Sequence, residues 1–267
     1  MKYLFDHWEK IKQDLKERKL MIFLDFDGTL APIVETPDKA NIPVQTKQLL
    51  KQLSKLSSCQ IVVISGRSLR DIKQKVGIDD IPYIGSHGLE IKGLHIIVSA
   101  ETERILETIK NELKNKLSSI QGVILEDKGL VLSVHYRLLS EDGAKIVEKI
   151  LLNVCQPYIE DRKIEIKFGK KVYEIRPSVD WDKGKAIFWV LSGRELADEN
   201  QDILPICIGD DVTDEDAFLA IKEKGLAIYV GEPQKSHAQY YLRNTNEVAD
   251  FLKQIYELKK DEKITKF

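Results

Sequence analysis

Short apolar runs alternate with amphipathic stretches along most of the chain. Continuous apolar runs, each bounded by a turn residue or a polar cluster, lie at 20–26, 59–66, 81–86, 204–211 and 225–231. Runs of this length are typical of strands that are buried on both faces of a parallel sheet. Amphipathic stretches with helical spacing lie between them at 44–57, 181–196 and 213–225. This alternation predicts an α/β fold, a doubly wound parallel sheet with helices on both faces.

The pattern changes between residues 92 and 178. The elements predicted in this region are a hairpin-like pair at 89–98, a helix at 101–117, strands at 122–127 and 130–137, a helix at 143–155, and strands at 163–169 and 171–177. Strands followed by a helix, repeated with short turns, indicate a small antiparallel sheet that carries two helices on one face. We therefore predict an α+β cap (92–178) inserted into a core formed by 1–91 and 179–267.

Composition narrows the class of protein. The chain has 267 residues, 43% of them hydrophobic, which is enough for a substantial core. Its 41 basic and 43 acidic residues are interspersed, so we expect neither a nucleic-acid partner nor a membrane partner. Cys59, Cys155 and Cys207 are widely spaced within apolar or amphipathic runs, as reduced core thiols are. Because no apolar run approaches about 18 residues, we expect a soluble, cytoplasmic protein. We also expect it to be a monomer.

Polar side chains follow three of the predicted strands. Asp25 and Asp27 come at the end of the first apolar run, Ser65 ends the second, and Asp210 and Asp211 end the fourth. In an open parallel sheet, ligands bind outside the carboxyl ends of the strands. Aspartate is a residue that can attack phosphorus and form an acyl-phosphate. The sequence therefore predicts a phosphoryl-transfer site with Asp25 as the candidate nucleophile.

The two neighbouring aspartates need a compensating charge. If strand geometry persists, Asp25 and Asp27 point to the same side, and two adjacent carboxylates are costly unless they share a cation or a proton. Mg²⁺ is suited to this position, since it takes oxygen ligands from one or two carboxylates, phosphate and water. Asp210 is the expected second side-chain ligand, and either Asp211 or Asp214 could be the next acidic partner.

Other residues suit a bound phosphate. Ser65 offers a hydroxyl beside the N–H groups of a turn, and Thr29 could add a hydroxyl or an N–H. Lys183 lies in the first turn of a predicted helix, where its charge and the positive helix end act at one place. Asp214 lies four residues after Asp210 and could orient Lys183 or a metal-bound water.

Four segments in order resemble the motifs of the haloacid-dehalogenase (HAD) superfamily of phosphatases: "DFDGTL", "VVISGR", "DKGKA" and "GDDVTDEDAF". More narrowly, "DFDGTLAPIVETPDKA", "ISGRSL", "GSHGLE", "SVHYR" and "EIRPSVDWDKGKA" resemble trehalose-6-phosphate phosphatases. The resemblance implies a Rossmann-like HAD core with an inserted cap, dependence on Mg²⁺ and Asp25 as nucleophile. It also implies that Asp27 acts first as general acid and then as base, with its backbone carbonyl on the metal.

Substrate-binding candidates lie in both predicted domains. In the core the matching motifs contain Thr29, Arg67, His87 and Glu90. In the cap, "VHYR" and "KKVYEIRP" offer His135, Arg137, Lys171, Glu174 and Arg176. Period-two alternation puts Glu174 and Arg176 on one strand face, and His135 and Arg137 on one face of theirs. The resemblance favours Glu174 as a ligand for sugar hydroxyls, with His87 and Glu90 lining the junction of core and cap.

Simpler explanations exist for each feature taken alone. "DGT" is a common turn signal, and acidic residues after Thr213 suit the first turn of a helix for dipole reasons. A lone histidine such as His87 or His135 is most often structural, and cap charges could form cross-strand pairs on a solvated sheet face. The ordered set of motifs nevertheless favours a catalytic site.

The predicted function is Mg²⁺-dependent hydrolysis of trehalose 6-phosphate. One alternative is a related HAD phosphatase acting on sucrose phosphate or mannosylphosphoglycerate, because cap contacts set the specificity. A second alternative is a sugar-phosphate sensor without turnover. The intact set of Asp25, Asp27, Lys183 and Asp210 argues against a sensor, which needs no nucleophile.

Overall fold

The structure is a computed structural model that describes residues 1–92, 94–95, 98–197 and 202–261. The chain forms two compact units. The core unit comprises Met1–Gly93 and Trp181–Phe267, and the inserted unit comprises Leu94–Asp180. The bounds of the inserted unit differ by two residues at each end from those of the predicted cap.

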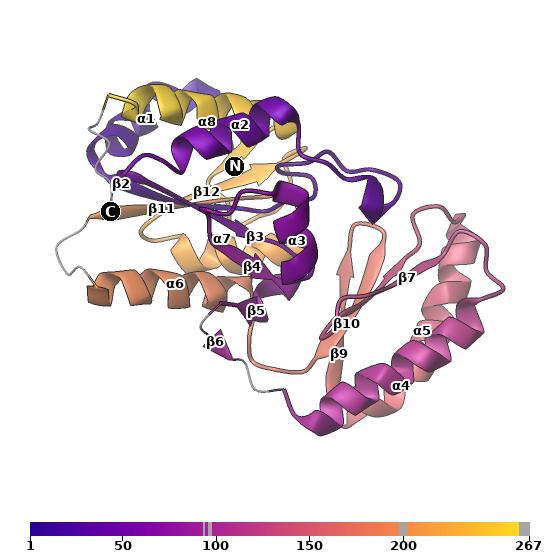
Figure 1. Ribbon diagram of the computed structural model, residues 1–267. Helices are drawn as coiled ribbons and strands as arrows, with labels where there is room; N and C mark the ends of the chain where they lie inside the picture. Colours follow the sequence, from indigo (N-terminus) through magenta and orange to yellow (C-terminus); the bar gives the residue numbers. More distant parts are fainter. Residues whose placement is uncertain (93, 96–97, 198–201, 262–267) are drawn as a thin grey trace. The chain divides into compact units, whose positions relative to one another are not determined.

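A nine-stranded sheet forms the centre of the core unit, in the order β1-β13-β12-β11-β2-β3-β4-β5-β6 (Figure 1). The five apolar runs form β2 (Lys19–Leu24), β3 (Cys59–Ile64), β4 (Tyr83–Gly85), β11 (Ile203–Gly209) and β12 (Leu226–Val230). From β1 to β4 all neighbours are parallel. The predicted doubly wound sheet is confirmed. The sequence did not predict β1 (Lys2–Tyr3) or β13 (Tyr240–Leu242), which are too short to give a pattern.

Helices cover both faces of this sheet because its central strands are apolar on both sides. Ile22 and Leu24 of β2 pack in one core with α1 (Trp8–Glu17), α2 (Val44–Leu53), α3 (Leu69–Val76) and α8 (Thr245–Lys259). Met21 and Phe23 face the opposite side, where α6 (Lys183–Ala197) and α7 (Glu215–Ile221) pack. The predicted helices at 44–57, 181–196 and 213–225 are therefore confirmed.

The hairpin predicted at 89–98 belongs to the large sheet. Its strands are β5 (Glu90–Ile91) and β6 (Leu94–His95), and β5 pairs with β4 in antiparallel orientation. The prediction that this pair begins the antiparallel sheet of the cap was wrong, because backbone pairing with the edge strand β4 is not visible in a hydrophobic pattern. Residues 93, 96 and 97 lie outside the described residues.

The inserted unit contains a four-stranded antiparallel sheet in the order β7-β8-β10-β9. Its strands are β7 (Ile124–Asp127), β8 (Leu132–His135), β9 (Ile164–Gly169) and β10 (Val172–Pro177). Two helices, α4 (Ala100–Leu117) and α5 (Glu141–Glu160), pack on one face around a core that includes Tyr173 and Ile175. Because side chains alternate along β10, Glu174 and Arg176 lie on the other face.

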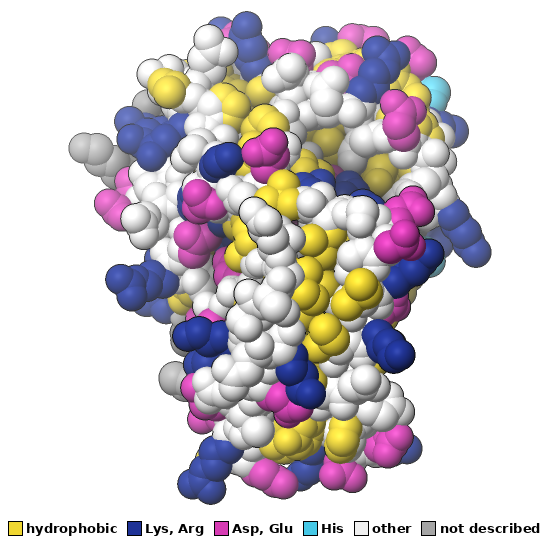
Figure 2. All heavy atoms as spheres, turned by 90° about the vertical axis from the view of Figure 1, so that its right-hand side faces the viewer, with side chains coloured by type: hydrophobic (Ala, Val, Ile, Leu, Met, Phe, Trp, Pro, Cys, Tyr) yellow, Lys and Arg dark blue, Asp and Glu magenta, His cyan; other side chains and the backbone are white. Residues whose placement is uncertain are grey.

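Among the described helices, none is both long enough and apolar enough to cross a bilayer. On the face in Figure 2, basic and acidic side chains are interspersed.

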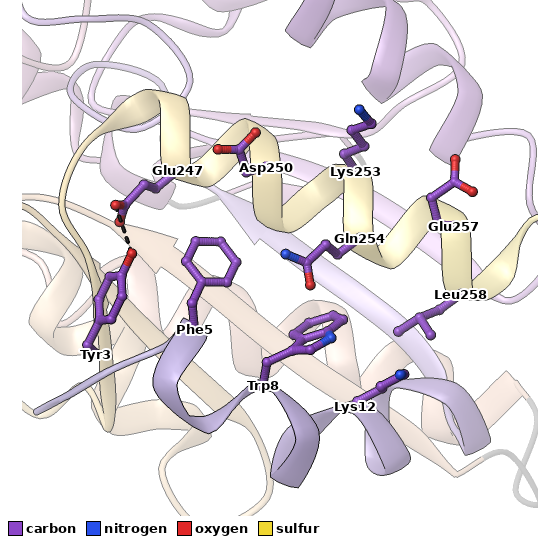
Figure 3. A pocket seen from close by; sticks show the side chains of 10 residues that line it. All are labelled: Tyr3, Phe5, Trp8, Lys12, Glu247, Asp250, Lys253, Gln254, Glu257 and Leu258. Atoms are coloured by element: carbon purple, nitrogen blue, oxygen red, sulfur yellow. Dashed lines mark hydrogen bonds between the residues drawn. The ribbon is translucent and has the colours of Figure 1, made fainter.

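A groove of about 670 Å³ lies between α8 and the N-terminal segment, where it is lined by Tyr3, Phe5, Trp8 and Leu258 among others (Figure 3). No residue predicted for the catalytic site lines this groove as described.

Candidate active site

Asp25 follows the last residue of β2 and is held in place by its neighbours. Its backbone N–H donates to the carbonyl of Ile208 in β11, at 3.0 Å, so the main chain continues the sheet pairing beyond the strand. Its side chain is buried, with 6% of the residue exposed. The structure thus places this carboxylate at the carboxyl edge of the sheet, between two central strands.

Lys183 connects Asp25 with Asp214. It is the first residue of α6, 2% exposed, and its Nζ lies 2.9 Å from Oδ1 of Asp25 and 2.7 Å from Oδ1 of Asp214. The second oxygen of Asp214 accepts hydrogen bonds from the backbone N–H groups of Asp210 and Asp211, each at 3.1 Å. Asp214 therefore orients Lys183 and also fixes the loop that follows β11.

Asp25, Asp210 and Asp214 form a cluster that could hold a metal ion. Each offers one carboxylate oxygen, and these oxygens all lie within 4.8 Å of one another in buried positions. Asp211 instead accepts a hydrogen bond from the N–H of Val212 at the start of a helical turn. Three carboxylates around one ammonium leave an excess of negative charge, and hard oxygen ligands suit a divalent cation such as Mg²⁺.

Burial and charge shift the pKa values of this cluster. Desolvation raises the pKa of Asp25 well above its usual value, and repulsion by Asp214 and Asp210 acts in the same direction, whereas Lys183 lowers it. Burial alone would lower the pKa of Lys183, but the carboxylates of Asp214 and Asp25 raise it overall. Lys183 is therefore a cation, and a second positive charge would favour the ionised form of Asp25.

Gly28 allows the loop after β2 to approach Asp210. Its φ is +83°, a conformation that glycine adopts without steric cost. A Cβ at this position would lie 2.1 Å from Oδ2 of Asp210. The glycine is required both by the backbone angle and by the space that the Asp210 carboxylate fills.

Asp27 lies outside the carboxylate cluster. Because β2 ends at Leu24, the alternation that placed Asp25 and Asp27 on one side does not extend to them. The carboxylate of Asp27 instead accepts two hydrogen bonds from Arg67, from Nε at 2.7 Å and from Nη2 at 2.8 Å. The Asp27 side chain is 43% exposed, so it remains accessible to a substrate.

The remaining predicted core residues lie in the segments that follow β2, β3 and β4. Ser65 is buried, and its Oγ accepts from the N–H of Arg67 at 3.2 Å. Oγ1 of Thr29 is buried and finds no hydrogen-bond partner in the described part of the chain. His87 has a left-handed backbone (φ 55°) and packs so closely on Gly66 that a Cβ there would lie 2.4 Å from its ring. Glu90 accepts from the N–H of Leu69 and the hydroxyl of Ser86, both at 2.7 Å, and so supports this turn.

In the inserted unit, four polar side chains form a group that we call the polar row: Glu126, Lys128, His135 and Glu174. Glu126 and Glu174 are both paired with Ser133 across the sheet. Nζ of Lys128 lies 3.5 Å from Oε1 of Glu174 and 3.8 Å from Oε2 of Glu126, and Nε2 of His135 lies 2.8 Å from that Oε2. Our prediction included His135 and Glu174 but missed Glu126 and Lys128, which lie two positions apart in "LEDKG" at a strand end.

The contacts of the other predicted cap residues lie outside the polar row. Arg176 forms an ion pair with its cross-strand neighbour Glu165 at 2.9 Å. Arg137 lies beyond the end of β8, so it does not share a strand face with His135, and it donates to the carbonyl of Lys170 at 2.7 Å. The Lys171 ammonium lies 5.9 Å from the ring centre of Tyr136. Arg137 and Lys171 are exposed, which agrees with the surface explanation, whereas Arg176 has the expected cross-strand partner but is buried.

The predicted site residues of both units all lie within a segment that matches a known protein family. A sequence profile of the family described as "Trehalose-phosphatase" matches residues 23–246, from the strand before Asp25 to the start of α8. This chain belongs to the trehalose-phosphatase family. The predicted family and the predicted enzyme class, a phosphatase, are confirmed.

Relatives of the trehalose-phosphatase family match nearly the whole chain. "Probable trehalose-phosphate phosphatase C" of Arabidopsis thaliana is 35% identical, over 96% of this chain and 82% of the relative. "Trehalose-phosphate phosphatase B" of the same plant is 34% identical, over 95% of this chain and 70% of the relative. The sequence similarity therefore extends over both units.

Solved structures support the fold of this trehalose-phosphatase family member. The C-terminal domain of the C. albicans trehalose-6-phosphate phosphatase superposes with a TM-score of 0.78 at 24% identity, covering 94% of this chain and 96% of that one. A trehalose-6-phosphate phosphatase related protein gives 0.74 at 27% identity, covering 91% and 100%. A HAD-like hydrolase from B. subtilis, at 13% identity, gives 0.54 with coverage of 87% and 98%, so the HAD fold is confirmed.

Proposed function

We propose that this protein hydrolyses trehalose 6-phosphate to trehalose and phosphate in the cytoplasm, with Mg²⁺ as cofactor. The observation that carries the proposal is the buried Lys183, which bonds both Asp25 and Asp214 beside Asp210 at the strand ends. The relatives are named as trehalose-phosphate phosphatases, and this supports trehalose 6-phosphate as the substrate. We expect a monomer whose partner is the sugar phosphate, without nucleic acid or membrane.

The reaction would proceed in two steps. An oxygen of Asp25 attacks phosphorus in line, the bond between phosphorus and the sugar oxygen breaks, and Asp27 donates a proton to that oxygen. Asp27 then accepts a proton from a water molecule as the water attacks the phosphoryl group. The bond between phosphorus and Asp25 breaks, which returns both aspartates to their starting states.

Neighbouring groups would stabilise the charge on the transferred phosphoryl group, which is most of the catalytic task in such reactions. Lys183 holds the nucleophile at 2.9 Å and keeps its charge in a buried position. Ser65 and Thr29 are buried, and their hydroxyls could donate to phosphate oxygens. Asp25, Asp210 and the backbone carbonyl of Asp27 would hold Mg²⁺, with Asp214 nearby, and the bound ion would supply positive charge for the phosphate.

For the sugar, the polar row of the inserted unit supplies suitable groups. Away from its phosphate, trehalose offers hydroxyl groups and no charge, so a selective site needs side chains that accept and donate together. Glu126 and Glu174 accept, and Lys128 between them donates. We propose Glu174 as a ligand of sugar hydroxyls, with Glu126 and Lys128 beside it.

A phosphate-release assay tests this function against its rivals. The protein is incubated with trehalose 6-phosphate, sucrose 6-phosphate and mannosylphosphoglycerate, each with Mg²⁺ or with EDTA. We expect release from trehalose 6-phosphate with Mg²⁺, little release with EDTA, and none from Asp25→Asn. Faster release from another substrate would identify a related sugar phosphatase. Binding of a sugar phosphate without any release would identify a sensor.

A further inference from the structure

Arg67 places most of its hydrogen-bonding capacity on groups within the protein. A guanidinium has five N–H donors. In this structure Nε and Nη2 donate to Asp27, Nη1 donates to Asp71 at 2.7 Å, and Nη2 also donates to the carbonyl of Pro37 at 2.8 Å. Its side chain is 5% exposed. A ligand for an incoming phosphate would need free, accessible donors, which Arg67 largely lacks.

The contacts of Arg67 come from separate segments and fix it on all sides. Pro37 begins a helical turn (Pro37–Lys39), whereas Asp71 lies in the first turn of α3. The main chain of Arg67 is held as well, because its N–H donates to Ser65 Oγ and its carbonyl accepts from the N–H of Ser86 at 2.7 Å. The guanidinium also lies over the ring of Phe26, 5.2 Å from its centre. Arg67 is therefore a rigid support.

Asp27, by contrast, has a partly exposed carboxylate on a loop. Without a partner, rotation about its side-chain bonds would spread the carboxylate over several orientations. The planar fork of an arginine binds both oxygens at once and selects one orientation, which a lysine ammonium cannot do. Two hydrogen bonds occupy two of about four lone-pair positions on a carboxylate, so positions remain for a proton.

We propose that Arg67 is a positioning residue that holds the carboxylate of Asp27 in the orientation needed for proton transfer to the leaving group. This inference rests on the proposed function, in which Asp27 is the general acid. It assigns Arg67 a role different from the substrate binding predicted from the sequence. The effect of Arg67 should therefore depend on Asp27 and on how strongly the leaving group needs a proton.

Two substrates separate this role from phosphate binding. A sugar oxygen must be protonated as it leaves, whereas p-nitrophenolate leaves readily without a proton. Because kcat/KM reports on steps up to the first bond cleavage, it isolates the acid role of Asp27 from its later role as base. General acid catalysis typically contributes about a hundredfold or more, so a misplaced acid should be measurable on the sugar phosphate.

The test is a double-mutant cycle between Arg67→Ala and Asp27→Asn, measured with p-nitrophenyl phosphate and with a sugar phosphate that the wild type hydrolyses. We expect Arg67→Ala to lower kcat/KM for the sugar phosphate at least about tenfold, but to change it less than about threefold for p-nitrophenyl phosphate. In the Asp27→Asn background, Arg67→Ala should change kcat/KM for the sugar phosphate less than about twofold.

Further variants keep the test decisive if Arg67→Ala folds poorly. Arg67→Lys retains the charge and the stem but not the fork, so it should show the same substrate dependence with a smaller loss of thermal stability than Arg67→Ala. Arg70→Ala is the matched control, because Arg70 is exposed on α3, and it should leave both substrates unaffected. Equal losses on both substrates, or equal losses in the wild-type and Asp27→Asn backgrounds, would overturn the inference and return Arg67 to phosphate binding. A wild type that releases phosphate from p-nitrophenyl phosphate but from no sugar phosphate would refute the proposed function separately.

Discussion

The charged groups of the two units are organised differently. In the core unit, Asp25, Lys183 and Asp214 are almost fully buried and are connected by hydrogen bonds of 2.7 to 2.9 Å. In the polar row of the inserted unit, the side chains of His135 and Glu126 are 19% and 27% exposed, whereas those of Lys128 and Glu174 are each 8% exposed. The contacts of Lys128 there are longer, 3.5 and 3.8 Å. The core site is held by short contacts between buried groups, whereas the polar row combines two buried with two partly exposed side chains and has longer contacts at Lys128.

This difference follows from what each region is proposed to do. Buried charges interact strongly because the local dielectric is low, but each must be compensated by a partner. Phosphoryl transfer requires such strong, pre-oriented charges. Recognition of hydroxyl groups needs donors and acceptors that can exchange water for a ligand, so partial exposure is suitable. The comparison therefore predicts that variants of the buried cluster of Asp25, Asp210 and Asp214 affect all substrates, whereas polar-row variants affect only sugar substrates.

The largest expected effect is that of Asp25→Asn. An amide keeps the shape of the carboxylate but is a far poorer nucleophile, so kcat should fall about a thousandfold or more on every phosphate ester. Activity is measured by phosphate release and folding by thermal unfolding. Activity near that of the wild type would show that the nucleophile lies elsewhere.

Substitution of Gly28 by alanine should have the next largest effect. Displacement of Asp210 by the new methyl group should lower kcat/KM about a hundredfold on both sugar and aryl phosphates. Gly129→Ala in the inserted unit is a matched control, since Gly129 has the same φ of +83° and a Cβ there would meet no atom within 4 Å. If the two variants lose activity equally, backbone strain rather than contact with Asp210 explains the loss.

Glu174→Ala tests the polar row. Loss of a ligand for sugar hydroxyls should lower kcat/KM for trehalose 6-phosphate more than about tenfold, about 1.4 kcal/mol, yet hardly change it for p-nitrophenyl phosphate. Glu174→Gln keeps an acceptor and should lose less. An equal fall on both substrates would assign Glu174 a structural role, and no fall on either would leave it as a cross-strand partner.

The smallest expected effect is that of Asp210→Asn on thermal stability in the absence of metal. Desolvation and the charges of Asp214 and Asp210 raise the pKa of Asp25 in the folded state above its usual value of 3.8. The folded protein therefore loses stability as the pH rises from 3.8 towards the raised pKa of Asp25. Asp210→Asn removes one repulsion, so its thermal unfolding in EDTA should rise by a few degrees, about 2–4 °C per kcal/mol, and by more at neutral than at acidic pH. A uniform change across pH would exclude coupling to Asp25.

Much of the fold and of the core site followed from local patterns in the sequence. The runs that became β2, β3 and β11 carry their polar residues at the carboxyl ends, so Asp25, Ser65 and Asp210 could be placed at one edge of the sheet. Lys183 could be placed there because its helix begins with it. The short strands β1 and β13 could not be predicted, since two or three residues show no period.

Contacts between residues that are far apart in the chain could not be predicted from the sequence. Nothing near Asp27 indicates that its partner is Arg67, 40 positions away, because the contact depends on where β2 ends and how the loop turns. Lys128 likewise approaches Glu174 across 46 positions through the order of strands β7, β8 and β10. Motif similarity predicted which residues form the site, but it did not predict their partners.

The central claim is that Asp25 accepts the phosphoryl group and that Asp27 assists its arrival and its release. Asp27→Asn with p-nitrophenyl phosphate tests this directly, because the first step needs no acid and the second lacks its base. We predict a burst of p-nitrophenolate equal to the enzyme concentration, slow turnover afterwards, and an acid-quenched peptide in which Asp25 carries one phosphoryl group. Steady release without a burst, with the phosphoryl group on another residue or on none, would contradict the account.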